Sequence, residues 1–268
     1  MDGSAVTGIG QASDGRPDPV LYERRGAAAI VTINRAHRRN AVDGLTAAAL
    51  GEAYQRFAAD DEALCMVLTG DGDQAFCAGA DLKALETFAE RMMLPEGPLG
   101  FTRLTSAKPT IAAISGWCLA GGLELALWCD LRICAEGTTF GFPERRWGVP
   151  LIDGGTQRLP PIVGLGRALE LILTGRMVEL DEAMRIGLAN EVTAPGGHLT
   201  RALELVETLA AFPRDTMLAD RQAALDGVGL SLEEGLEIEL KTGPATAMTA
   251  FTGASKFADG AGRGGVGV

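Results

Sequence analysis

The sequence predicts an α/β protein with a helical C-terminal part. In the first half of the chain, β-branched or apolar runs of strand length alternate with segments of helical period, and such alternation is typical of the α/β class. Beyond Glu144 the period is helical, and no strand-rich segment follows Val192. We therefore expect four regions, which are a flexible lead-in at 1–18, a core at 19–195, a helical region at 196–258 and a flexible tail at 259–268.

Composition limits the classes of function. The chain has 268 residues, enough to bury a full core, and its 47% hydrophobic and 22% charged content is that of a globular protein. A net charge of −11 argues against nucleic acid, because phosphate backbones bind to basic surfaces. It leaves room for a small anionic ligand held by a few local cations.

The five cysteines are an odd number, and none has metal-ligand spacing with either histidine. We expect buried, reduced thiols in a cytoplasmic protein and no metal site. The apolar stretch 111–129 contains Glu124 and is followed directly by Asp130. Burial inside the protein therefore explains this stretch better than a membrane crossing does.

The first elements can be placed in order. Two strands are expected at 20–35 around a turn at Gly26, followed by a helix that Asp43 caps and whose apolar positions begin at Leu45. The continuous apolar run at 63–70 predicts a strand buried on both faces.

Less regular segments follow. Residues 71–85 predict a loop that leads into a short helix near Asp81. The segment 86–104 has weak periodicity and two prolines, which indicates a mobile surface region that could cover a ligand, or a plain connection. Farther on, Ser231 and Glu234 form a capping-box signature.

The stretch from Pro109 to Glu144 carries the chemistry. It predicts a strand, a Gly-rich turn, a short apolar helix, a second strand and another turn, with Glu124 on the helix and Glu144 at the second turn. The helix begins at Gly121–Gly122, where unpaired N–H groups and the helix dipole favour negative charge. We therefore interpret this stretch as an active site.

Four segments together resemble the crotonase (enoyl-CoA hydratase/isomerase) superfamily. They occur in the order and spacing of that family, and they are VTINRAHRRNAV at 31–42, AFCAGADLKAL at 75–85, ISGWCLAGGLELALWCDLRICAE at 114–136 and FGFPERRWGVPLIDGGTQRLPPIVG at 140–164. The resemblance implies a spiral core of repeated ββα turns with a helical C-terminal trimerisation region. It also implies a homotrimer or dimer of trimers that acts on acyl-CoA thioesters of fatty acid metabolism, with no cofactor beyond the coenzyme A of the substrate.

The shared chemistry of the family is stabilisation of a thioester enolate by two backbone N–H groups, which by position belong to Ala80 and Gly121. Small residues let a ligand approach the backbone closely, although tight packing at turns explains them as well. Glu124 and Glu144 match the two glutamates of the hydratases, in which one carboxylate activates water and its partner delivers a proton. Two carboxylates in an apolar pocket can share a proton. Singly, either could be a surface residue or part of an ion pair.

Asp153 departs from the hydratase pattern Pro-Gly-Ala-Gly-Gly-Thr, because here an acid precedes the glycines. An acid at this point resembles the dienoyl-CoA isomerases, so Asp153 is a candidate third acid. It could instead cap a helix that begins near Gly154.

Three hypotheses result. The first is a hydratase that adds water to a trans-2-enoyl-CoA, and the second is a double-bond isomerase that uses Glu144 and Asp153. The third is a non-catalytic acyl-CoA-binding scaffold, against which two intact glutamates argue.

Residues around these positions are candidate substrate contacts. The resemblance places Arg38, Arg39 and Lys83 in segments that line the CoA channel of the family. The other candidates for contact with the CoA thioester are Ala78, Gly79, Asp81, Leu82 and Gly122, and Trp117 and Trp147 are candidates for the acyl wall. Lys256 could reach a phosphate from a neighbouring subunit, and Phe142 is a further candidate for the acyl wall. The cations could equally be solvated surface residues, and the aromatic side chains core residues.

Overall fold

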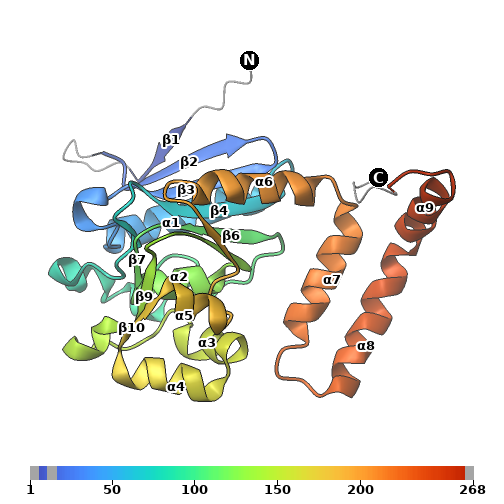
Figure 1. Ribbon diagram of the computed structural model, residues 1–268. Helices are drawn as coiled ribbons and strands as arrows, with labels where there is room; N and C mark the ends of the chain where they lie inside the picture. Colours follow the sequence, from blue (N-terminus) through green and yellow to red (C-terminus); the bar gives the residue numbers. More distant parts are fainter. Residues whose placement is uncertain (1–5, 11–16, 263–268) are drawn as a thin grey trace. The chain divides into compact units, whose positions relative to one another are not determined.

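A computed structural model describes residues 6–10 and 17–262. The chain divides into two compact units, Met1–Leu203 and Glu204–Val268, which Figure 1 colours from blue to yellow and from orange to red. Most of the predicted lead-in and the end of the predicted tail lie outside the described residues. Within the lead-in, Thr7–Ile9 forms strand β1 and pairs with β2, which the sequence analysis did not predict.

The first unit contains two sheets. The larger has the order β1-β2-β3-β4-β6-β8-β11; β2 is antiparallel to both neighbours, and the strands from β3 onward are parallel. The smaller has the order β10-β9-β7-β5. The larger sheet consists of β1 (Thr7–Ile9), β2 (Val20–Arg25), β3 (Ala28–Ile33), β4 (Cys65–Gly70), β6 (Thr110–Ile114), β8 (Leu131–Ala135) and β11 (Glu191–Thr193), and the smaller of β5 (Ala75–Cys77), β7 (Trp117–Leu119), β9 (Thr139–Gly141) and β10 (Met177–Glu179).

From β4 to β9, consecutive strands alternate between the two sheets. β4 is followed by β5, β6 by β7 and β8 by β9, so that each pair adds one strand to the larger sheet and one to the smaller. A helix follows β7 directly. This arrangement produces the repeated ββα turns that the sequence predicts, and it places the ends of β5, β7 and β9 beside one another.

Helices complete the first unit. The α-helices are α1 (Gly44–Ala59), α2 (Gly121–Trp128), α3 (Gly155–Val163), α4 (Leu165–Thr174) and α5 (Leu180–Arg185), and the 3-10 helices are η1 (Ala36–Arg38), η2 (Leu82–Phe88), η3 (Arg91–Met93) and η4 (Pro143–Trp147). Helix α6 (His198–Ala210) contains the boundary between the units.

The predicted early elements are confirmed. β2 and β3 pair around the turn at Gly26, every residue of β4 is buried, and the Asp43 side chain caps α1 by accepting a hydrogen bond from the Thr46 amide. Leu45 is 46% exposed, so its predicted place on the buried face of α1 is wrong. The three-residue strands β5, β7, β9 and β10 were not predicted, because so short a run carries no period.

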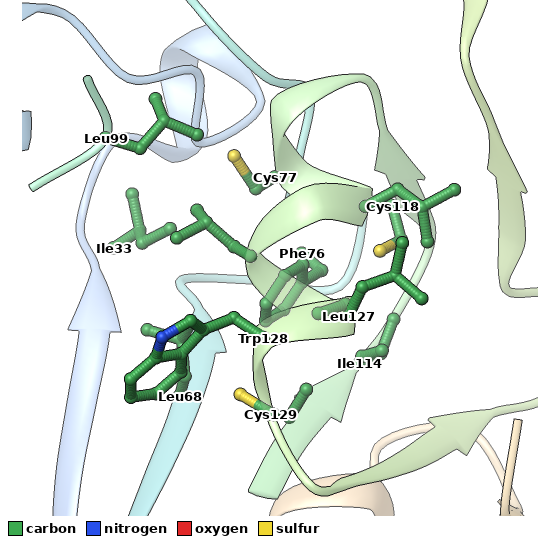
Figure 2. Close-up of a cluster of buried hydrophobic side chains, with 14 of the residues drawn as sticks. Ile33, Leu68, Phe76, Cys77, Leu99, Ile114, Cys118, Leu127, Trp128 and Cys129 are labelled. Carbon is green, nitrogen blue, oxygen red and sulfur yellow. The ribbon is translucent and has the colours of Figure 1, made fainter. Parts of the chain in front are cut away.

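Helix α2 lies in the centre of the core. Every residue after Gly121 is buried, as expected for a helix that is apolar all round. Figure 2 shows side chains from several strands, among them Ile33, Leu68 and Ile114, gathered around this helix. The buried Arg132 guanidinium donates hydrogen bonds to carbonyls at the C-terminal end of α2, where a cation complements the helix dipole. Glu124 is thus carried by a rigidly packed element.

The prediction of a mobile surface region at 86–104 is wrong for the part of it that enters the core. Leu99 and Phe101 are buried. The Phe101 ring stacks on Tyr54 at 5.5 Å between centroids and meets Trp128 edge-on at 4.5 Å. These partners lie far away in sequence, so periodicity within the segment could not reveal the contact.

The second unit is helical, as predicted for this part of the chain. The described elements within it are α7 (Arg214–Asp226), α8 (Leu232–Thr242), η5 (Gly243–Thr246) and α9 (Ala247–Ala258). The predicted capping box of Ser231 and Glu234 is confirmed. Among the residues that the structure describes, no helix combines the length and apolar character that a membrane crossing requires.

Candidate active site

A cavity of about 410 Å³ opens beside the N-terminus of α2. Its lining is mostly apolar, yet three carboxylic acids reach it, Glu124, Glu144 and Asp153. Glu124 and Glu144, the two acids of the predicted active-site stretch, both line this cavity. The other lining residues are Ala78, Ala80, Leu82, Leu85, Phe88, Ala89, Met92, Pro98, Leu99, Ala120, Gly121, Pro143, Trp147, Gly148, Val149, Pro150 and Ile152.

The Ala80 and Gly121 backbones lie side by side at this cavity. A Cβ atom built on Gly121 would be 3.6 Å from the Gly79 Cα and 3.7 Å from the Ala80 nitrogen. Neither amide donates a hydrogen bond to any other residue that the structure describes. Two adjacent backbone donors are therefore left for a ligand, and such a pair can hold an oxyanion.

The backbone around these donors has little freedom. Gly79 has a φ of +91°, and a Cβ there would be 2.7 Å from the Ala120 Cβ and 2.9 Å from the Gly121 nitrogen. Ala120 has a φ of 53° and a ψ of −128°, a conformation that an alanine rarely adopts. Such strain persists only where the surrounding structure enforces it, and it is common at ligand sites.

Backbone hydrogen bonds from the segment 39–42 hold the turn that contains Ala80. The Ala78 amide donates to the Arg39 carbonyl at 3.1 Å, the Val42 amide to the Gly79 carbonyl at 2.8 Å, and the Asp81 amide to the Val42 carbonyl at 2.7 Å. The Gly79 amide donates to the Cys77 Sγ at 3.3 Å, so the amides on either side of Ala80 are engaged, whereas the Ala80 amide donates to no residue that the structure describes. These contacts also bring the predicted basic loop at Arg38 and Arg39 next to the turn.

Glu124 is held by two amides. It is 3% exposed, and its Oε1 accepts hydrogen bonds from the Asp153 amide at 3.0 Å and the Gly155 amide at 2.8 Å. Burial nevertheless raises the pKa of Glu124 to about 8, and the charges of Asp153 and Glu144 add to this rise. At neutral pH this carboxyl group can carry a proton.

The carboxyl group of Glu144 accepts no hydrogen bond from any residue that the structure describes. Glu144 lies in the first turn of η4 after Pro143, and it is 5% exposed. Burial raises its pKa to about 7. A buried carboxyl group without a partner is costly, so its place beside an open cavity suits a group that meets a ligand or water.

Asp153 does not cap helix α3, so that prediction is wrong. The residue in the cap position is Gly154, and no side chain caps the helix. The Asp153 carboxylate contacts the segment 99–102 instead. Its Oδ1 accepts hydrogen bonds from the Leu99 amide and the Thr102 hydroxyl group. Proximity in sequence favoured the cap, whereas the observed partners lie some fifty residues earlier in the chain.

The predicted substrate contacts divide into two groups. Ala78, Leu82 and Trp147 line the cavity. The lining residues do not include Arg38, Arg39, Gly79, Asp81, Lys83, Gly122 and Trp117.

Local contacts explain some of these positions. The Trp117 ring packs against the Arg39 guanidinium at 4.4 Å, and the Asp81 carboxylate pairs with Arg35 at 3.2 Å. Phe142 is fully buried and is not among the residues that line the cavity.

Several residues that line the cavity were not predicted from the sequence. Leu85, Phe88 and Met92 line the cavity. Leu82, Leu85 and Phe88 recur at intervals of three along η2, which is kinked at Ala84, where φ is −128° and ψ is 30°. That period is a signal which the search for helical and strand periods overlooked.

All five cysteines are buried and none forms a disulfide, as the sequence predicts. Among residues 6–10 and 17–262, no three His, Cys, Asp or Glu side chains are grouped so that they could hold a metal ion.

Comparisons with known proteins agree with this geometry. The family model "Enoyl-CoA hydratase/isomerase" matches residues 23–258. A short-chain-enoyl-CoA hydratase from Clostridium acetobutylicum is 36% identical over 224 residues, 82% of this chain and 86% of the relative. An (E)-benzylidenesuccinyl-CoA hydratase from Thauera aromatica is 35% identical over 81% of this chain and 86% of its own length.

Solved structures give the same answer for the fold. The crystal structure of an enoyl-CoA hydratase from Mycobacterium tuberculosis H37Rv superposes with a TM-score of 0.83 at 35% identity, covering 90% of this chain and 96% of that one. With two sheets that grow by alternating strands, a cavity at the start of α2 and a family match over most of its length, this chain belongs to the enoyl-CoA hydratase/isomerase family and has the crotonase fold.

Proposed function

We propose that this protein is an enoyl-CoA hydratase, a hydro-lyase that adds water across the C2=C3 double bond of a trans-2-enoyl-CoA thioester. The observation that carries the proposal is the convergence of Glu124, Glu144 and the free amides of Ala80 and Gly121 on one apolar cavity. Family membership supports an acyl-CoA thioester as the substrate.

The two amides would bind the thioester carbonyl oxygen. When water attacks C3, negative charge moves onto this oxygen, and fixed donors stabilise the resulting enolate without reorganising. One such donor contributes about 2.7–4 kcal/mol to lowering the barrier. The positive end of the α2 dipole acts in the same direction, because Gly121 is the first residue of that helix.

The two glutamates would move the protons. One carboxylate takes a proton from the attacking water, and the other, as an acid, delivers a proton to C2. The pKa values of about 8 for Glu124 and about 7 for Glu144 let the pair hold one proton near neutral pH, and the titration belongs to the pair as a whole. Because one proton enters the pair and one leaves it, the pair still holds one proton, which is now on the carboxyl group that acted as the base. A proton transfer between the two carboxyl groups restores the starting state.

Further properties belong to the same proposal. We expect coenzyme A to enter only as part of the substrate, with no other cofactor, and the enzyme to act in the cytoplasm. Assembly into a homotrimer or a dimer of trimers is supported by an apolar stripe on α8, where Leu232, Leu236 and Leu240 are 80%, 52% and 74% exposed. Exposed stripes of this kind are typical of subunit interfaces.

The test is hydration of crotonyl-CoA, followed as the loss of ultraviolet absorbance of the conjugated thioester. We expect wild-type turnover, and we expect Glu144→Gln to lower kcat by about 10²- to 10⁴-fold, the range for loss of a general acid or base, while binding of a CoA ligand persists. Glu136→Gln, at an exposed turn position, is the matched control. Full hydration by Glu144→Gln would refute the assignment.

Asp153 keeps the isomerase as a second candidate, because it lines the same cavity as Glu144. Conversion of a 3,5-dienoyl-CoA without uptake of water, abolished by Asp153→Asn, would favour this candidate. Absence of turnover across a panel of enoyl-CoA substrates would favour a binding scaffold over both enzymes.

A further inference from the structure

Asp153 joins two parts of the cavity wall. Its carboxylate is 4% exposed, and both of its hydrogen bonds end on the same oxygen. Oδ1 accepts from the Leu99 amide at 3.0 Å and also from the Thr102 hydroxyl group. Leu99 lines the cavity, so this oxygen fixes one wall of the site.

The backbone of the same residue holds Glu124. The Asp153 amide and the Gly155 amide both donate to the Glu124 Oε1. A displacement of the turn 152–155 would therefore move both donors together. The side chain of Asp153 anchors this turn on one side, and the turn anchors Glu124 on the other.

Arg158 reinforces the anchor. From the first turns of α3, its guanidinium donates to the Asp153 carbonyl at 2.9 Å and to the Thr102 carbonyl at 2.6 Å. The turn and the segment that contains Thr102 are thus linked twice, once through a carboxylate and once through a guanidinium. Since Arg158 bonds only carbonyl oxygens here, it leaves the Asp153 Oδ1 to its two other donors.

We propose that Asp153 is a positioning residue that sets the place of Glu124 and of the cavity wall at Leu99, and that it exchanges no proton with the substrate. The proposal rests on the proposed hydratase function. The Asp153 Oδ1 already accepts hydrogen bonds from two donors, which gives it a structural role. The residues around an active site have to hold its reacting groups to within about 0.5 Å.

The charge of Asp153 has a separate effect on Glu124. The groups that interact with Glu124 are Asp153 and Glu144, whose charges raise its pKa, and Arg158, which faces it with the opposite charge. An asparagine at 153 can keep the geometry, because its Oδ1 can accept the same two hydrogen bonds, but it removes the negative charge. The pKa of Glu124 is then lower, and the pH profile of kcat moves to lower pH.

Three variants separate geometry from charge. We expect Asp153→Asn to keep kcat for crotonyl-CoA within about threefold of wild type, with its pH profile moved to lower pH. Asp153→Ala loses both bonds, and we expect kcat to fall about 10²-fold, the cost of misplacing a reacting group by about 1 Å. Thr102→Val keeps shape and removes one donor, and we expect an intermediate loss. Asp181→Ala, at an exposed position on α5, is the control and should match wild type.

Each of the following results would contradict the proposal. Loss of activity in Asp153→Asn as large as in Asp153→Ala would overturn the proposal, because it would indicate proton exchange. Wild-type kcat and an unchanged pH profile in Asp153→Ala would overturn it as well. If Asp153→Ala does not fold, Thr102→Val takes its place, and wild-type kcat in that variant is the contrary result.

The crystal structure of each variant makes the test independent of turnover. We expect the Glu124 carboxyl group to stay in place in Asp153→Asn and to shift in Asp153→Ala or Thr102→Val. If the wild-type protein hydrates no enoyl-CoA, the proposed function fails and the turnover tests do not apply. The positioning of Glu124 is then contradicted if Glu124 keeps its place in those two variants.

Discussion

Alanine at position 79 tests the paired amides directly. Gly79 has a φ of +91°, and a Cβ there would lie 2.9 Å from the Gly121 nitrogen, against about 3.4 Å for an ordinary contact. The Gly121 amide must therefore move by about 0.5 Å, a displacement at the limit of what a preorganised site tolerates. The neighbouring Ala120 Cβ, at 2.7 Å, blocks movement of the new methyl group in its direction.

The expected loss follows from the role of the amide. Removal of one oxyanion donor lowers kcat by about 10²- to 10³-fold, and we expect Gly79→Ala to reach at least the lower end of this range. KM should change less, because the donor acts mainly on charge that develops in the transition state.

Gly137→Ala is the matched control. Gly137 has a similar φ of +84°, and no atom lies within 4 Å of its virtual Cβ. Both variants carry the same backbone strain, roughly 1–2 kcal/mol, but only Gly79→Ala disturbs the amide pair. The assay is crotonyl-CoA hydration on samples whose thermal unfolding is measured in parallel. A folded Gly79→Ala protein with the kcat of Gly137→Ala would refute the reasoning.

Two further predictions concern stability. Burial raises the pKa of Glu124 to about 8 and that of Glu144 to about 7, above the usual 4.5, so the folded protein binds more protons than the unfolded chain between these values. The free energy of unfolding should therefore fall as pH rises from about 5 to about 8, and Glu124→Gln should be more stable than wild type at pH 8 by on the order of a few kcal/mol. Thermal unfolding measured across this pH range checks this prediction. A variant whose stability falls as steeply with pH as that of the wild type would contradict it. Arg132→Met should lower the free energy of unfolding by about 3 kcal/mol, because it leaves the carbonyls of Leu188 and Cys129 without their donors. Urea titration measures the free energy of unfolding of Arg132→Met and of the control Arg146→Met, which changes an exposed residue. Equal values for the two variants would show that α2 does not depend on the Arg132 guanidinium.

The residues at the centre of the site could be predicted from the sequence because the patterns that indicate them are local. Glu124 lies three residues after Gly121 on one short helix, and Glu144 directly follows a proline that begins the next turn. Glycine and alanine next to these acids indicate close approach of a ligand to the backbone, and a helix start indicates free amides. Each of these features can be read within a few neighbouring residues.

The features that were missed depend on contacts between distant segments. Asp153 finds its partners at Leu99 and Thr102, and Phe101 packs between Tyr54 and Trp128. A pattern within one segment favours a local cap or a loop, and only the folded chain brings these groups together.

The wall on η2 is a different case. Its three-residue spacing was present in the sequence, but a 3-10 period is short and occurs by chance in many loops.

The most direct measurement is a crystal structure with bound acetoacetyl-CoA. We predict the thioester carbonyl oxygen about 2.7–3.2 Å from the nitrogens of both Ala80 and Gly121, with the carboxyl groups of Glu124 and Glu144 facing C2 and C3 of the acyl group. A thioester oxygen that contacts neither amide, or an acyl group that lies outside the cavity between the two glutamates, would contradict the account.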